Sequence, residues 1–163
     1  MSYLVIALVV VMVISPIFWI MPSPKQKRQM QLRQRAMSVG FLVKLADMPQ
    51  THRAQVRKEK PEQGVVYRLP WEVKRKHPEG VDCLLMRNPS EEAGPALTGF
   101  AEQLQQQMRA CLDDLPDSVQ ALEYAQPGFA IYWREQGNAE LIDSLYQRLS
   151  QLRKQVLKLE SSI

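Results

Sequence analysis

Few side chains in this sequence could do acid–base or metal chemistry, and those few are scattered. The chain of 163 residues has two histidines, His52 and His77, and two cysteines, Cys83 and Cys111. Both histidines lie in polar stretches away from either cysteine, so no spacing typical of a metal site is present. We therefore expect neither a metal ion nor a cofactor, and we expect both thiols to be reduced and buried.

Carboxylates gather at one place, where Asp113, Asp114 and Asp117 flank Pro116 at the end of a predicted helix. Paired carboxylates can act as general acid and base, but at an exposed helix end we expect these three to be solvated. The sequence has no glycine-rich phosphate loop, no Gly-x-Ser-x-Gly turn and no His-Glu-x-x-His motif. We expect no catalytic residues, and the protein is predicted not to be an enzyme.

Basic side chains offer a different chemistry, which is attraction to anionic groups. Residues 25–77 hold fourteen Lys or Arg and four Asp or Glu, a net charge of +10, whereas residues 78–163 have a net charge of −6. Near an anionic bilayer each Lys or Arg contributes about 1 kcal/mol of attraction. The basic residues and two tryptophans that we expect to face lipid headgroups are Trp19, Lys25, Lys27, Arg28, Arg33, Arg35, Trp71, Lys74, Arg75 and Lys76.

The basic half also has simpler interpretations. For residues 25–35 the favoured one is the positive flank of a membrane segment, and for Trp71 it is an ordinary loop aromatic. Residues 53–77 leave two options open: solvated loops, or a surface held against the bilayer or an acidic partner. Nucleic acid is not an expected partner, because no recognition-helix pattern, zinc spacing or RNA-binding signature accompanies the basic residues.

The first element that must position these groups is apolar. Residues 3–21 contain no charged side chain, and a bilayer core about 30 Å thick needs roughly 20 such residues of helix. We predict a transmembrane anchor over residues 1–22, uncleaved because its exit is bulky, and a basic juxtamembrane segment over residues 23–37. Since positive flanks stay in the cytoplasm, the N-terminus should lie outside a bacterial inner membrane in a single-pass topology. Residues 38–163 should then form a cytoplasmic domain.

That domain is predicted to be α+β. Short apolar or β-branched runs predict strands, and longer stripes at helical spacing predict helices. The order β-β-β-α-β-β-α indicates a small, mainly antiparallel sheet with two packed helices. The predicted elements are strands at residues 41–45, 64–69 and 81–86, a helix at 96–115, strands at 119–125 and 129–134 around a Pro-Gly turn, and a helix at 138–160.

The last predicted helix carries an apolar stripe at alternating steps of three and four residues. The stripe is short for a coiled coil, which needs three or four heptads. Docking of the stripe on the sheet is therefore the favoured interpretation. The alternative is a partner helix face, including a homodimer through this helix. The stripe consists of Ile142, Leu145, Leu149, Leu152, Val156 and Leu159.

The N-terminal part resembles a known family. Residues 17–28 read Ile-Phe-Trp-Ile-Met-Pro-Ser-Pro-Lys-Gln-Lys-Arg, and this stretch is similar to the YajC family, small accessory subunits of the bacterial preprotein translocase. The resemblance implies one N-terminal membrane helix, a basic motif after it, and a small cytoplasmic domain. It also implies association with the translocase.

These observations together predict a non-catalytic role. We expect a single-pass inner-membrane protein that acts as an accessory, scaffold or assembly subunit of a larger membrane complex, with integral membrane proteins as partners. The alternative is a peripheral module that tethers to, or senses, anionic lipid headgroups through its basic, membrane-proximal half.

Overall fold

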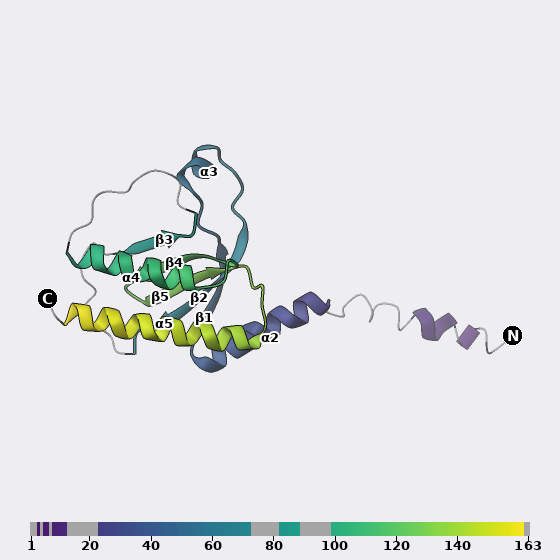
Figure 1. Cartoon of the computed structure of the whole chain (residues 1–163). Helices are drawn as coiled ribbons and strands as arrows, with labels where there is room; N and C mark the ends of the chain where they lie inside the picture. The colour runs from purple at the N-terminus through teal and green to yellow at the C-terminus, as the bar shows by residue number, and fades with distance from the viewer. Residues whose placement is uncertain are drawn as a thin grey trace. The chain divides into compact units, whose positions relative to one another are not determined.

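The computed structural model describes residues 3, 5, 6, 8–12, 23–72, 82–88 and 99–161 (Figure 1). The chain divides into two compact units, Met1–Gln31 and Leu32–Ile163. In the first unit, the start of helix α2 (Pro24–Val39) is well specified. The Ser23 N–H donates to Gln26 Oε1 at 2.8 Å, and the Gln26 N–H donates to Ser23 Oγ at 3.3 Å. This reciprocal pair is a capping box, and Pro24 takes the first helical position, where no N–H is needed.

The predicted transmembrane helix is corrected by the structure. Within the ranges given above, no helix combines the length and the hydropathy needed to cross a bilayer. Residues 3, 5, 6 and 8–12 are helical. The rest of the predicted anchor, including residues 13–22, lies outside the described residues.

The second unit is an α+β domain built on a five-stranded antiparallel sheet. Along the sheet the strands follow the order β1-β2-β5-β4-β3. The β4–β5 hairpin therefore lies between β2 and β3, which are consecutive in sequence. The strands are β1 (Leu42–Asp47), β2 (Gln63–Pro70), β3 (Cys83–Met86), β4 (Val119–Ala125) and β5 (Gly128–Trp133).

The predicted order of elements is wrong, because one helix of the domain was missed: a short helix, α3 (His52–Val56), lies between β1 and β2. Helix α2, which precedes β1, coincides with the juxtamembrane segment, where the composition of residues 26–37 is typical of a helix. Thr51 starts α3 as its N-cap, since its hydroxyl accepts a hydrogen bond from the Ala54 N–H. A helix of five residues is too short to show an apolar period, so this polar stretch indicated a loop.

Helices α4 (Phe100–Asp114) and α5 (Ala139–Glu160) run in opposite directions, side by side, on one face of the sheet (Figure 1). Their apolar stripes pack on the aromatic side chains of β2 and β5, including Tyr67, Phe129 and Trp133, each fully buried. The last turns of α2 add Leu32 and Ala36 to the same core. Within the described residues, these three helices all pack on this one face of the sheet, and none of them covers the opposite face.

Candidate functional site

The predicted headgroup-facing residues divide into three groups. Lys25, Lys27 and Arg28 are exposed on the first turns of α2, in the first unit. Trp19 and residues 74–76 lie outside the described residues. The others, described next, make contacts within the domain.

Arg33 makes a partly buried ion pair. Its Nε and Nη2 donate to the two carboxylate oxygens of Glu135 at 2.6 and 2.7 Å, and the Tyr67 hydroxyl donates to the same carboxylate at 2.8 Å. The Glu135 side chain is only 2 % exposed. The hydrogen bond to Glu135 raises the pKa of Arg33, while burial, and then Glu135, raises the pKa of Tyr67. Arg33 is therefore a clamp, in the sense that it joins α2 to Glu135, just after β5, and through Glu135 to Tyr67 on β2.

Arg35 and Trp71 also contact the domain itself. Arg35 donates to both carboxylate oxygens of Asp143 on α5, at 3.1 and 2.9 Å, in an exposed pair. Trp71 packs edge-on against Tyr124 and Phe129, and its indole N–H donates to the Ala125 carbonyl at 3.3 Å. Trp71 thus extends the aromatic core, as an ordinary packed loop residue does.

The apolar stripe of α5 faces the sheet. Ile142, Leu145, Leu149, Leu152 and Val156 are buried in the core, and Leu159 is half-buried. Five of these six side chains are therefore already covered by the domain's own sheet.

The side of the sheet on which no described helix packs, here called the outer face, is largely apolar, and its central residues Val66, Ala121 and Ala130 are themselves buried. Antiparallel sheets with one wet face normally alternate apolar and polar residues along each strand. Of the ten side chains in the two rows that cross all five strands, three are charged, and the other seven are aliphatic, Met or Tyr. Strand pairing arranges the ten in two rows, Leu42–Arg68–Ala130–Glu123–Leu84 and Lys44–Val66–Tyr132–Ala121–Met86.

A polar triad occupies the middle of the outer face. Because Ala130 is small, Arg68 on β2 reaches across β5 to Glu123 on β4, with Nη2 at 3.1 Å from Oε1 and 3.3 Å from Oε2. The Tyr132 hydroxyl donates to Glu123 Oε2 at 2.8 Å. Burial, and then the hydrogen bond to Glu123, raises the pKa of Tyr132 to about 12, so this hydroxyl remains a donor at neutral pH.

The triad is incomplete in one respect. Arg68 Nη1 is buried, and within the described ranges it has no hydrogen-bond partner. The rim of the face carries exposed leucines, Leu42 at 60 % and Leu84 at 49 %, beside the exposed Lys44. Exposed apolar side chains around a small polar centre are suited to covering by another protein.

A second surface lies at the α3 loop, residues 48–62, between β1 and β2. The exposed basic residues Arg53, Arg57, Lys58 and Lys60 lie close to Val56 in the sequence, and the Val56 side chain is 68 % exposed. One of these basic residues is paired, since Arg57 Nη1 lies 3.7 Å from Glu59 Oε1. The α3 loop therefore presents an apolar tip among positive charges, a combination suited to an anionic surface.

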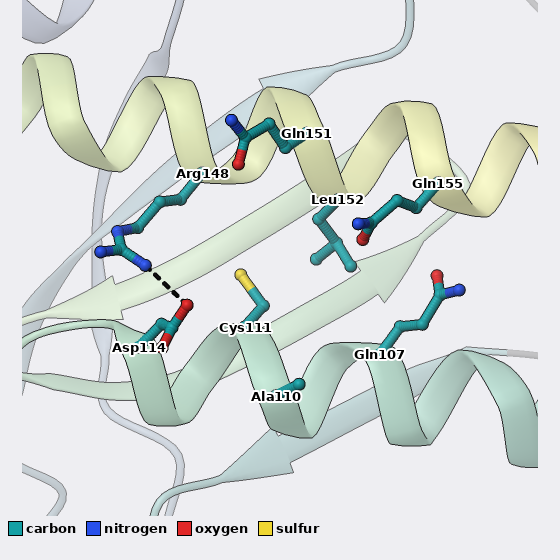
Figure 2. Close-up of a pocket in the computed structure, with 8 residues that line it drawn as sticks. All are labelled: Gln107, Ala110, Cys111, Asp114, Arg148, Gln151, Leu152 and Gln155. Carbon is teal, nitrogen blue, oxygen red and sulfur yellow. Dashed lines mark hydrogen bonds and ion pairs between the residues drawn. The ribbon is translucent and has the colours of Figure 1, made fainter.

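A polar groove of about 340 Å³ runs between α4 and α5. Figure 2 shows side chains of both helices pointing toward one another, with Arg148 and Asp114 joined by an ion pair of 2.8 Å. Burial raises the pKa of the Cys111 thiol to about 11, so it is protonated and weakly nucleophilic at neutral pH. The groove is otherwise lined mainly by amides, from Gln107, Gln151 and Gln155.

The described ranges hold no cluster of three or more His, Cys, Asp or Glu side chains that could bind a metal ion. Asp113 and Asp117 are exposed, and Asp114 belongs to the pair with Arg148. Sequence reasoning missed the outer face. Its signal is the set of alternate residues on β2, β4 and β5, and it becomes visible only once these strands are known to be neighbours.

The chain was compared with known proteins at three levels. No protein-family model, no curated protein and no solved structure matches it. The outer face, the α3 loop and the groove are therefore the observations that bear on its function.

Proposed function

We propose that the protein is a non-catalytic accessory or scaffold subunit of a larger membrane complex, with its α+β domain on the cytoplasmic side of a bacterial inner membrane. The location is supported by the uncharged residues 3–21 and by the basic residues that follow them. The resemblance of residues 17–28 to the YajC family makes the preprotein translocase the first complex to test.

The outer face of the sheet carries this proposal. Its rim carries the exposed leucines Leu42 and Leu84 beside the exposed Lys44, and Arg68 and Glu123 are gathered with Tyr132 in a hydrogen-bonded centre. Protein interfaces have this composition, because charges are depleted where water is excluded and aromatic residues and Arg are enriched there. A catalytic centre instead needs a group poised to react, and the Glu123 carboxylate already accepts bonds from Arg68 and Tyr132.

The test is purification of the tagged full chain from membranes in mild detergent. We expect stoichiometric membrane proteins to accompany the wild type. The variant Leu84→Lys should lose most of them, because a cation replaces an apolar rim residue. Leu157→Lys is the matched control, since Leu157 is an exposed leucine on α5, at 41 %, away from the outer face. If the wild-type chain is purified from the membrane fraction with no other protein bound to it, the accessory role is contradicted.

The α3 loop supports a second candidate, a tether to anionic lipid. Residues 52–60 have a net charge of +3 and place Val56 at an exposed position. A photo-crosslinking amino acid at position 56 of the full chain, in phosphatidylglycerol vesicles, should then form lipid adducts detectable by mass spectrometry. The adducts should fall sharply at high salt and in phosphatidylcholine vesicles. Position 157 is the control, and equal labelling at both positions rules the tether out.

A further inference from the structure

We propose that the outer face binds a second copy of this chain, with the two sheets packed face to face. The two copies are related by a two-fold axis that lies directly above β5 and runs parallel to the strands. This inference rests on the proposed function, because it names the partner of the same face. It also moves self-association away from the α5 stripe, which the core already covers.

The outer face is self-complementary. A two-fold axis above β5 brings each position into contact with the position equally far on the other side of β5. In the row Leu42–Arg68–Ala130–Glu123–Leu84, Arg68 then meets the partner's Glu123, and Glu123 meets the partner's Arg68. The same operation places Leu42 against the partner's Leu84. Charge opposes charge and leucine opposes leucine, without any rearrangement of the strands.

In the second row the same operation places Lys44 beside the partner's Met86 at the rim. Val66 meets the partner's Ala121, and the two Tyr132 side chains meet near the axis. Face-to-face sheets pack about 10 Å apart, so small residues must alternate with large ones between them. Ala121, fully buried by its neighbours, provides a low position into which the partner's larger Val66 can pack.

The polar triad of Arg68, Glu123 and Tyr132 is incomplete within one copy. Arg68 Nη1 is buried without a hydrogen-bond partner in the part of the chain that the structure describes, and an unsatisfied buried N–H costs free energy. The guanidinium has a second edge, whereas Glu123 uses both of its oxygens with Nη2 and Tyr132. Because Nη1 is already enclosed within one copy, a second carboxylate can reach it only if the Arg68 side chain turns toward the partner. Two Arg68 and two Glu123 side chains can then form one closed network across the interface.

Charge reversal gives a sharp test, made on the full chain in mild detergent with two differently tagged copies expressed together. In a dimer of Arg68→Glu with itself four carboxylates meet, and in a dimer of Glu123→Arg with itself four guanidinium groups meet. We expect each variant to capture its own tagged copy at least 10-fold less than the wild type does. When Arg68→Glu is expressed with Glu123→Arg, both crossing pairs are restored, and capture should return to near the wild-type level.

Three controls keep the test decisive. Each reversal also places like charges together within one copy, so circular dichroism must show that both variants are folded. Leu84→Lys leaves the triad in place and should reduce self-capture as strongly, whereas Leu157→Lys should not. Self-capture that survives Leu84→Lys and both reversals, or a mixed pair that does not associate, overturns the inference.

The failure of this inference can be distinguished from failure of the proposed function. If the wild type captures no second copy but still brings down a membrane protein in a Leu84-dependent way, the outer face binds a different partner. The self-association is then wrong and the accessory role stands. If the wild type brings down neither, both are wrong.

Discussion

Replacing Arg33 with alanine is expected to lower the free energy of unfolding by about 3 kcal/mol, at the lower end of the range measured when one member of a buried ion pair is removed. The Glu135 carboxylate, 2 % exposed, would retain only the Tyr67 hydroxyl as a hydrogen-bond donor among the contacts described above. The effect is placed at the lower end because the Arg33 side chain is 31 % exposed, so water can partly replace it. Urea unfolding of the full chain, followed by circular dichroism, measures the change.

Arg35 is the matched control for this experiment. It lies two positions along the same helix and also makes a bidentate pair with a carboxylate, but both partners are exposed. An exposed pair contributes between zero and about 1 kcal/mol, so Arg35→Ala should change stability little. Equal destabilisation by the two substitutions contradicts the clamp. If Arg33→Ala instead leaves stability unchanged but weakens lipid contact, Arg33 belongs with the headgroup-facing residues.

The sequence was most informative where structure is local. Pro127 and Gly128 between two β-branched and aromatic runs predicted the β4–β5 hairpin, and the structure has strands at these positions. The stripes of α4 and α5 were equally visible, because an amphipathic helix shows its buried face at a fixed spacing.

The sequence was least informative where contacts are distant. Arg33 and Glu135 are separated by 102 positions, and Arg68 and Glu123 by 55. No local pattern connects them, so a basic residue before the domain indicated only a membrane flank. Both pairs depend on the placement of the β4–β5 hairpin beside β2, which the order of elements along the chain does not reveal. The outer face was missed for the same reason.

The second large prediction concerns the β4–β5 hairpin, which contributes the central strands of the outer face. Gly128→Ala is expected to destabilise the domain by about 3 kcal/mol or more, through steric overlap and backbone strain together. Gly128 has a φ of +137°, and an added Cβ would lie 2.1 Å from the Leu69 carbonyl oxygen and 2.8 Å from the Pro70 Cα. Both atoms belong to the backbone of β2, the strand paired with β5, so they cannot move aside without breaking the ladder.

Gly99→Ala separates the two contributions. Gly99 also has a positive φ, +63°, but an added Cβ would meet nothing within 4 Å. Only backbone strain remains, and a loss of about 1 kcal/mol is expected. Thermal unfolding of both variants measures the difference, which reports how closely β2 approaches the hairpin. If the two alanine variants have the same melting temperature, β2 and β5 are not packed as described. Arg68 and Glu123 would then not meet across Ala130. If Gly128→Ala unfolds at a much lower temperature than Gly99→Ala, the register that aligns the outer face is supported directly.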